Sequence, residues 1–359
     1  MTNSCQIFIV PRTSKIKQEK LMSFDVTVQP SGHQFTVKKD EFILDAALRQ
    51  GISFPYGCRS GTCATCLGNV LSGSVEYPKG LPLSLMENEH EQGKALFCSA
   101  VATSSLVIEV KEIVGVTDIQ AKTLPARVTS LRKLSHDVME MTLKLPATER
   151  LQFRAGQYIE FLLRDGKRRA FSIANSPSND EYVELHLRLI EGGYFTQHVF
   201  NEMKEKALVR INGPLGTFFI RDDSKRPLIF IAGGTGFAPI KSMVEKLIEE
   251  GDKREMHIYW GVRAQTDLYS DHLPKKWDYQ HENIHYVPVL SATNESDNWE
   301  GREGFVHKAV ATDFNDLSAY DVYMAGPPPM INAAKELFIQ QGLAEKNLFS
   351  DSFEYSEDS

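Results

Sequence analysis

The stretch Cys58–Cys66, CRSGTCATC, places three of the chain's five cysteines within nine residues. A fourth, Cys98, follows in ALFCSA, so the full pattern is C-x4-C-x2-C and then one distant cysteine. The fifth, Cys5, stands apart near the start of the chain. Three kinds of structure bring cysteines together in this way: a disulfide knot, a zinc site and an iron–sulfur cluster.

The spacing distinguishes these three structures. Structural zinc sites usually pair two C-x2-C knuckles, whereas a four-residue gap with a single distant cysteine is the plant-type arrangement of a [2Fe–2S] cluster. Gly57 and Gly61 allow the loop to wind closely, and the small Thr62 and Ala64 leave its amides facing the bridging sulfides. The predicted cluster ligands are Cys58, Cys63, Cys66 and Cys98, and Cys5 is predicted to be a free thiol.

The bulk composition is that of an ordinary folded protein, and its 359 residues suffice for two or three domains without covalent cross-links. The net charge of −7 argues against a nucleic-acid partner, which would favour a clustered basic face. No apolar run reaches the roughly 18 residues that span a bilayer, and the N-terminus does not fit a signal peptide. We therefore expect a cytoplasmic protein with reduced thiols and without a membrane partner.

The segments around the cysteines predict a small sheet domain. Residues 24–37 are typical of two strands around a turn at Ser31–Gly32. Residues 43–51 predict a short helix that ends at glycine, and residues 106–110 predict a closing strand.

The middle of the chain alternates apolar and polar residues in short segments, which predicts an antiparallel barrel. Within it, RRAFSIANSP (168–177) places Arg169, Phe171 and Ser172 on one strand. A charge, a ring and a hydroxyl suit a ligand with a phosphate and a flat ring system, although a plain barrel strand explains them equally well. In GGYFTQHVF (192–200), Thr196 is predicted to N-cap a helix whose free amides attract a pyrophosphate.

The last third begins at Pro227 with PLIFIAGGTGFAPIKSMVEKLIEEG, which predicts a strand, a glycine loop and a helix. The loop is G-x-G-x-x-P (234–239), and Pro239 is compatible with a first helical turn. The segments MHIYWGVR and DVYMAGPPPM predict further parallel strands that end in glycine-containing loops. Open parallel sheets bind ligands at such carboxyl ends, so we predict a nucleotide site there.

Several motifs together resemble the ferredoxin–NADP reductase superfamily. They are RAFS (169–172), GPLG (213–216), GGTG with the following proline (233–239) and GPPPM (326–330). With an N-terminal plant-type ferredoxin domain, the chain is similar to the reductase components of multicomponent oxygenases. The resemblance covers residues 22–353. It implies a multidomain α+β and α/β fold: a β-grasp ferredoxin domain, an antiparallel β-barrel flavin domain and a parallel-sheet α/β nicotinamide-nucleotide domain.

The predicted division of the chain follows from these segments. It consists of a disordered tail (1–21), a [2Fe–2S] ferredoxin domain (22–111), a linker (112–123), an FAD-binding barrel (124–223), an NAD(P)-binding domain (224–353) and an acidic tail (354–359). Translation starting at Met22 is an alternative to a disordered tail.

The resemblance also implies roles for single residues. Arg169 is expected to hold a flavin phosphate, Phe171 to pack on the isoalloxazine, and Ser172 to hydrogen-bond near flavin N5. The superfamily usually has tyrosine at the position of Phe171, which removes one flavin contact here. Phe353 is expected either to cover the other flavin face or simply to dock the C-terminus. The remaining residues expected to contact FAD or the nicotinamide dinucleotide are Arg188, Gly193, Thr196, Gly234, Thr235, Gly236, Pro239, Arg263, Gly326 and Met330.

The implied function is an NADH-dependent reductase that passes electrons from NADH through FAD and the [2Fe–2S] cluster to a partner enzyme. Asp267 favours NADH over NADPH because a carboxylate disfavours a 2′-phosphate, whereas Arg263 favours NADPH. The favoured partner is the pyridoxamine-phosphate-dependent sugar dehydrase of CDP-3,6-dideoxyhexose synthesis, with a ring-hydroxylating oxygenase as the alternative. Phe171 and Ala325 also occur in free-flavin reductases, but that class leaves the cluster unexplained. A further alternative is a non-enzymatic redox sensor, which would keep the cluster but would not need the intact nucleotide loops found here.

Overall fold

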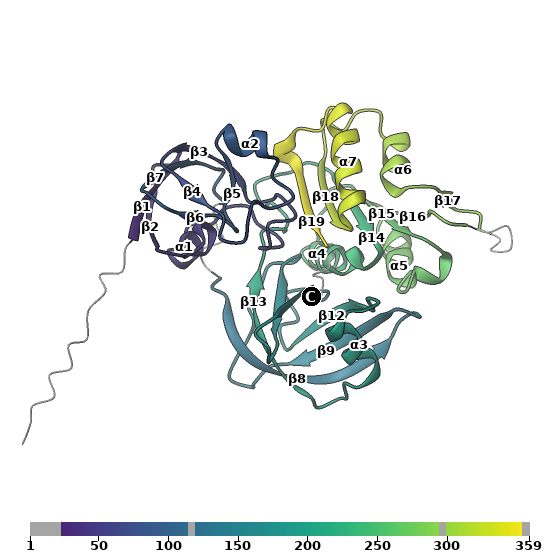
Figure 1. Ribbon diagram of the computed structural model, residues 1–359. Coiled ribbons are helices and arrows are strands. Elements are labelled where there is room, and N and C mark those ends of the chain that lie inside the picture. Colours follow the sequence, from purple (N-terminus) through teal and green to yellow (C-terminus); the bar gives the residue numbers. More distant parts are fainter. Residues whose placement is uncertain (1–22, 114–118, 294–298, 354–359) are drawn as a thin grey trace, which may run out of the picture.

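The computed structural model describes residues 23–113, 119–293 and 299–353, which fold into three consecutive domains (Figure 1). The N-terminal domain has a five-stranded mixed sheet, the barrel domain a six-stranded antiparallel sheet and the C-terminal domain a six-stranded parallel sheet. The expected fold class is confirmed. In Figure 1 the barrel domain lies at the bottom, with the N-terminal domain at upper left and the C-terminal domain at upper right.

The N-terminal domain packs helix α1 against a sheet of order β2-β1-β7-β3-β5. Its elements are β1 Ser23–Gln29, β2 Gln34–Lys38, α1 Ile43–Arg49, β3 Leu67–Ser72, β4 Val75–Glu76, α2 Glu87–Glu91, β5 Lys94–Leu96, β6 Val101–Ala102 and β7 Leu106–Glu109. The expected hairpin and helix are present. Gly51 follows α1 with a φ of +80°, a conformation that glycine adopts without strain. The predicted tail and the alternative start at Met22 lie outside the described residues.

The barrel domain follows the expected alternation of side chains. Its elements are β8 Lys122–Lys133, β9 Val138–Lys144, β10 Tyr158–Leu162, β11 Arg168–Ser172, β12 Tyr182–Arg188, α3 Tyr194–Asn201 and β13 Leu208–Leu215. The sheet order is β11-β10-β13-β8-β9-β12, and a bridge between Ile173 and Leu185 joins its two edges into a barrel. On β8, Leu124, Ala126 and Val128 are buried while their neighbours are exposed, because strand side chains alternate between faces.

Two details of the barrel domain differ from the sequence predictions. Helix α3 begins at Tyr194 with Gly193 at its N-cap, so the prediction that Thr196 caps this helix is wrong. Thr196 lies in the first turn instead, where its Oγ1 accepts a hydrogen bond from Ile190 N and donates to Gly193 O. The segment GPLGTFFI (213–220) is typical of a glycine-bracketed turn that leads into a strand, but β13 ends at Leu215, before the second glycine, and residues 216–220 leave the sheet.

The C-terminal domain has the parallel order β17-β16-β15-β14-β18-β19. Its elements are β14 Leu228–Gly233, η1 Gly234–Gly236, α4 Phe237–Glu249, β15 Met256–Val262, η2 Gln265–Asp267, α5 His272–Gln280, β16 Ile284–Leu290, β17 Arg302–Glu303, α6 Val306–Asp313, β18 Asp321–Gly326, α7 Pro328–Gln340, η4 Glu345–Asn347 and β19 Leu348–Ser352. Helices α4 and α5 share one core with Phe230, whereas α6 and α7 share the other with Ile231. The sheet is therefore covered on both faces, and its strand ends are left for a site.

Candidate functional site

The four predicted cluster cysteines are all free thiols and meet around the loop between α1 and β3. They form two pairs. The Cys63 thiol donates to the Cys58 sulfur and lowers the pKa of Cys58 to about 4, and the Cys66 thiol likewise lowers the pKa of Cys98. Among the described side chains, no three cysteine sulfurs lie within 4.8 Å of one another.

This paired arrangement distinguishes between a zinc site and an iron–sulfur cluster. A tetrahedral zinc site, with Zn–S bonds of about 2.3 Å, would bring all four sulfurs to within about 4 Å of one another. Two separate pairs instead match two irons with two thiolates each. Backbone amides also point at the sulfurs, since Ser60 N and Cys63 N each donate to Cys58 Sγ at 3.4 Å. The donor set therefore fits a [2Fe–2S] cluster.

The loop is tightly wound at Gly61. This residue has a φ of +82°, and a Cβ there would lie 2.6 Å from Ser99 Oγ and 3.1 Å from Pro82. Ser84 Oγ also donates to the Gly61 carbonyl at 2.6 Å. By contrast, a Cβ at Gly57 would make only ordinary contacts, the nearest at 3.5 Å. Of the two glycines singled out in the sequence, only Gly61 is required by the space available.

The start of this loop rests on the barrel domain. The Tyr158 hydroxyl donates to the Gly57 carbonyl at 2.8 Å. Tyr56 N and Thr217 Oγ1 lie 2.9 Å apart, and the same hydroxyl oxygen lies 2.9 Å from Tyr56 O. These contacts fix the cysteine loop beside strand β10, next to the strand β11 that carries the predicted flavin residues.

Ser172, at the end of β11, makes a contact that the sequence analysis did not anticipate. Its Oγ donates to Asp351 Oδ2 at 3.3 Å, and both side chains are buried. Burial raises the pKa of Asp351 to about 7, although the hydrogen bond from Ser172 acts in the other direction. A carboxylate in the strand-like segment LFSDS is a candidate buried charge, but nothing in that segment points to Ser172 as its partner.

Arg169 and Phe171 lie on the opposite side of β11 from Ser172, because strand side chains alternate. Phe171 is half-buried and packs against Phe161 and Phe195, with ring centroids 5.7 Å away in both cases. Arg169 Nη1 donates to Arg168 O at 2.9 Å. The three predicted flavin residues are thus held on one strand, with the ring of Phe171 supported from behind by the barrel core.

The turn before α3 carries the predicted pyrophosphate residues. A Cβ at Gly193 would lie 2.9 Å from Thr196 Oγ1 and 3.1 Å from Ile190, so the turn needs glycine. Within the described barrel residues, no side chain caps the first turn of α3. Its free amides fit an anionic group, whereas the Thr196 hydroxyl is engaged in holding the turn.

A cavity of about 530 Å³ lies between the barrel and C-terminal domains, at the carboxyl ends of the parallel strands. Six predicted residues line it: Arg188, Gly234, Thr235, Arg263, Met330 and Phe353. This volume is in the range of nucleotide and cofactor pockets. Gly234 has a φ of +54°, and a Cβ there would lie 3.2 Å from the Arg188 guanidinium. The cavity therefore fits a dinucleotide, with Arg188 as a cation beside the glycine loop.

Three predicted nucleotide residues do not line the cavity. A Cβ at Gly236 would lie 2.0 Å from the Ala325 carbonyl, so this glycine allows the loop to pack on β18. A Cβ at Gly326 would lie 2.9 Å from Met330 and 3.0 Å from Gly233. Pro239 is buried in the first turn of α4. These three residues shape the backbone around the cavity from behind.

The cavity also contains residues to which the sequence analysis gave no binding role. His307 is buried, and its Nδ1 has no hydrogen-bond partner among the described groups. Its ring stacks on Phe305, which is 59% exposed.

Phe353 packs on the core of the C-terminal domain and donates its backbone N–H to Gly326 O. Both expectations for Phe353, covering the flavin or docking the C-terminus, are compatible with this position.

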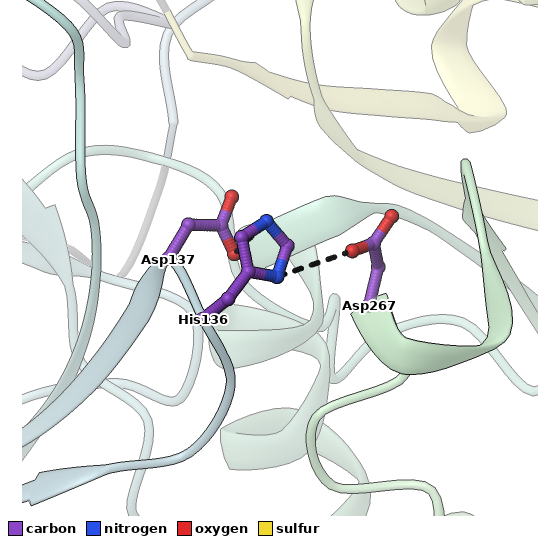
Figure 2. Close-up of side chains that lie close together, drawn as sticks. All are labelled: His136, Asp137 and Asp267. Atoms are coloured by element: carbon purple, nitrogen blue, oxygen red, sulfur yellow. Dashed lines mark ion pairs between the residues drawn. The ribbon is translucent and has the colours of Figure 1, made fainter.

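Beside the cavity, His136 lies between Asp137 and Asp267 and joins the barrel domain to the C-terminal domain (Figure 2). Its ring nitrogens are 3.7 Å from Asp267 and 3.8 Å from Asp137. Both carboxylates accept closer hydrogen bonds elsewhere, Asp137 from Arg188 Nε at 2.8 Å and Asp267 from Ala264 N at 3.0 Å. The imidazole is 66% exposed. The imidazole therefore makes only long contacts with the two carboxylates, one from each domain.

Three domain families match the chain in the order of its three domains. They are a 2Fe-2S iron-sulfur cluster binding domain over residues 26–103, an oxidoreductase FAD-binding domain over 125–220 and an oxidoreductase NAD-binding domain over 230–336. The matches support all three groups that the geometry fits. No helix among the described residues is long and apolar enough to cross a membrane.

Relatives match this chain over most of its length. The chain is 44% identical over 332 residues to the CDP-6-deoxy-L-threo-D-glycero-4-hexulose-3-dehydrase reductase of Yersinia pestis, covering 92% of this chain and 99% of that one. It is 39% identical over 342 residues to the reductase component of phenol 2-monooxygenase from Pseudomonas sp., covering 92% and 95%. Among solved structures, the Amycolatopsis cytochrome P450 reductase superposes with a TM-score of 0.78 at 30% identity, covering 92% and 98%.

Proposed function

The chain belongs to the family of iron–sulfur flavoprotein reductases that join a 2Fe-2S domain to FAD- and NAD-binding domains, and we propose that its electron acceptor is a sugar-nucleotide dehydrase. The proposed activity is that of a CDP-6-deoxy-Δ3,4-glucoseen reductase in CDP-3,6-dideoxyhexose synthesis. The similarity to the Yersinia reductase over 99% of its length supports this choice of partner. A cytoplasmic location belongs to the proposal, because thiols are kept reduced there.

The observation that carries the proposed electron path is the contact of all three domains around Ser172. Ser172 belongs to the barrel, its partner Asp351 to the C-terminal domain, and a Cβ at Gly57 of the N-terminal domain would lie 3.7 Å from Asp351. When bound, the nicotinamide and the flavin would supply hydride chemistry, and the cluster would supply one-electron chemistry. The chain itself orients these groups. At neutral pH, Asp351 is poised to hold or release a proton at Oδ2, next to the Ser172 hydroxyl.

The cofactor-binding roles in the proposal follow the same geometry. Arg169, Phe171 and the first turn of α3 would hold FAD, with Phe171 as a packed platform for the ring system. Gly234, Thr235 and Arg188 would hold the pyrophosphate of the nicotinamide dinucleotide in the 530 Å³ cavity. Asp267 lies in this lining and supports the choice of NADH over NADPH, because it would repel a 2′-phosphate, whereas Arg263 in the same lining acts in the opposite direction.

The test is anaerobic NADH oxidation by the purified protein with a pyridoxamine-phosphate-dependent sugar dehydrase and CDP-4-keto-6-deoxyglucose. We expect NADH consumption to require both the dehydrase and the sugar nucleotide. Cys63→Ser should lower this rate at least a hundredfold, because one thiolate of the first pair is lost, while NADH-dependent ferricyanide reduction continues. A reaction that proceeds equally well without the dehydrase would contradict the proposal.

An oxygenase is the second candidate acceptor, favoured by the 39% identity to a phenol monooxygenase reductase component. Single reduction of the protein by NADH, without turnover in the presence of the dehydrase, would favour this candidate. A free-flavin reductase would instead release its flavin on purification and reduce added riboflavin. The contact of the cysteine loop with the barrel argues against that class, because such an enzyme has no use for it.

A further inference from the structure

A group of exposed apolar side chains lies in the segment between β4 and α2. Leu81 is 38% exposed, Leu83 is fully exposed and Met86 is 68% exposed. We name these three residues the 81–86 patch. Single exposed apolar residues are common on protein surfaces, whereas apolar residues that gather in one exposed place mark interaction sites.

The patch is fixed directly on the cysteine loop. Pro82 packs against Gly61, and Ser84 Oγ donates to the Gly61 carbonyl at 2.6 Å. Leu85 is buried in the domain core and anchors the segment from below. Leu83 lies between the two residues that contact Gly61, so its side chain is presented to solvent beside the middle of the loop that carries the thiols.

The two sides of the loop have different surroundings. Gly57 is buried and bound by Tyr158 of the barrel, which is the side where electrons arrive in the proposed path. Ser60 and Thr62 are exposed, and Thr62 Oγ1 donates to Cys58 Sγ at 3.3 Å. On the side next to the 81–86 patch, the hydroxyl of an exposed threonine therefore lies directly against the Cys58 sulfur.

The helix that follows the patch is negatively charged, whereas the exposed Lys79 lies two residues before the patch. Helix α2 begins directly after Met86 and carries three glutamates, of which Glu89 is paired with Lys94 at 2.7 Å. Glu87 and Glu91 are exposed. A protein that covers the patch would bury apolar surface at its centre and meet carboxylates at its rim, so the complementary face is apolar with lysines or arginines around it.

We propose that the 81–86 patch, with Glu87 and Glu91, is the docking surface for the acceptor of single electrons, and that this acceptor presents an apolar spot ringed by cationic side chains. The inference rests on the proposed function only in requiring a protein acceptor. Each NADH would reduce two acceptor centres by one electron each and release NAD⁺ and one proton.

The test uses equine cytochrome c, a basic one-electron acceptor with lysines around an exposed haem edge, next to ferricyanide, which needs no docking surface. Leu83→Glu should raise KM for cytochrome c about tenfold, because a leucine that the complex would bury is replaced by a charge that would lose its water. The rate with ferricyanide and KM for NADH should not change. Leu83→Met should behave like the unaltered protein.

A matched control is Leu208→Glu, which removes another exposed leucine, 76% exposed, at the far end of β13 from the cysteine loop. It should leave KM for cytochrome c unchanged. The rim is tested by the double variant Glu87→Gln and Glu91→Gln, which should lower kcat/KM about threefold at low salt and have no effect at about 0.5 M salt, where charges are screened.

Equal KM values for Leu83→Glu and Leu208→Glu with cytochrome c would overturn the docking surface. The sugar dehydrase provides a second arm of the same experiment. If the unaltered protein does not reduce the dehydrase, the proposed function fails, and the cytochrome c arm still decides on the patch. If the dehydrase is reduced, Leu83→Glu should raise KM for it as well, and an unchanged KM would overturn the proposal.

Discussion

The barrel domain meets its two neighbours in different ways. Against the C-terminal domain it buries charges: Lys241 Nζ of α4 lies 3.1 Å from Glu184 of β12 and 3.0 Å from Glu245. His186 continues this network, with ring nitrogens 3.1 Å from Glu184 and from the Tyr269 hydroxyl. Against the N-terminal domain the polar contacts are neutral ones, between Thr217 and Tyr56 and between Tyr158 and Gly57.

The difference corresponds to what each junction has to do. Hydride transfer needs reacting atoms held about 3–3.5 Å apart, so the barrel and C-terminal domains must keep a fixed arrangement. Passing an electron to a neighbouring centre requires no such atomic contact. A buried ion network suits the first task because losing one partner strands the others without water, whereas neutral hydrogen bonds are individually weaker.

The largest expected effect is at the charged junction. Lys241→Met leaves Glu184 and Glu245 without their cation and should lower the free energy of unfolding by about 3–5 kcal/mol, measured by denaturant titration. Lys246→Met on the same helix is the control. It removes an exposed pair with Glu250, worth at most about 0.5 kcal/mol. A similar small effect for both variants would show that the buried network does not hold the junction.

The same variant has a predictable pH dependence. Burial acts to raise the pKa of Glu184, but the hydrogen bond from His186 and the charge of Lys241 bring it down to about 2. Because this lies below the unfolded value of 4.5, the carboxylate stabilises the fold above about pH 4.5, and this contribution is lost as the pH falls towards 2. The difference between Lys241→Met and the unaltered protein should therefore shrink below pH 4.5.

A second effect, of opposite sign, is expected where the two junctions meet. Burial raises the pKa of Asp351 from 3.8 to about 7, so its ionisation disfavours the folded state and stability falls as the pH rises from about 4 to about 7. Asp351→Asn removes this dependence. It should raise the free energy of unfolding on the order of 2–4 kcal/mol at pH 8 and leave it unchanged near pH 4. Calorimetry between these pH values measures the difference.

Asp252→Asn is the control for Asp351. Burial also acts to raise the pKa of Asp252, but hydrogen bonds from Arg254 lower it below its usual value. This variant should destabilise the protein at pH 8 instead of stabilising it. Destabilisation by Asp351→Asn at pH 8 would show that the ionised carboxylate is favoured in the fold, against the burial argument.

The parts of the site that depend on neighbouring residues could be predicted from the sequence. The cysteine spacing predicts that four thiols meet, and they do. The loop between Cys58 and Cys66 is too short to separate three of them, whereas the fold brings Cys98 to Cys66. The glycine loop before α4 was also predictable, because the strand, the glycines and the helix follow one another directly in the sequence. Thr196 shows the limit of local rules. Gly193 takes the N-cap because the turn has no room for a side chain, and this is evident only from its contact with Ile190.

The residues that join the domains could not be found in this way. Lys241 looks like a surface position of an amphipathic helix, and its burial depends on Glu184, which lies 57 residues earlier in another domain. Burial raises the pKa of Asp351, and its hydrogen-bond partner Ser172 lies 179 residues earlier, in another domain. Such pairs follow from how the domains pack, and no pattern within either segment predicts them.

The smallest expected effect is at the neutral junction. Tyr158→Phe removes the donor to the buried Gly57 carbonyl, a bond of 2.8 Å, and should lower the free energy of unfolding by only about 1–2 kcal/mol. The informative measurement is rapid mixing with NADH at separate flavin and cluster wavelengths. Hydride transfer to the flavin should keep its rate, because the charged junction is intact. Reduction of the cluster should slow a few-fold, because the cysteine loop is held less firmly against the barrel.

Tyr182→Phe is the control. It removes a hydroxyl that accepts a hydrogen bond from Asn179 within the barrel, and it should change the rate of neither phase. If Tyr158→Phe slowed the flavin phase as much as the cluster phase, the two junctions would not be independent, and the contrast between a positioning interface and a conducting one would fail.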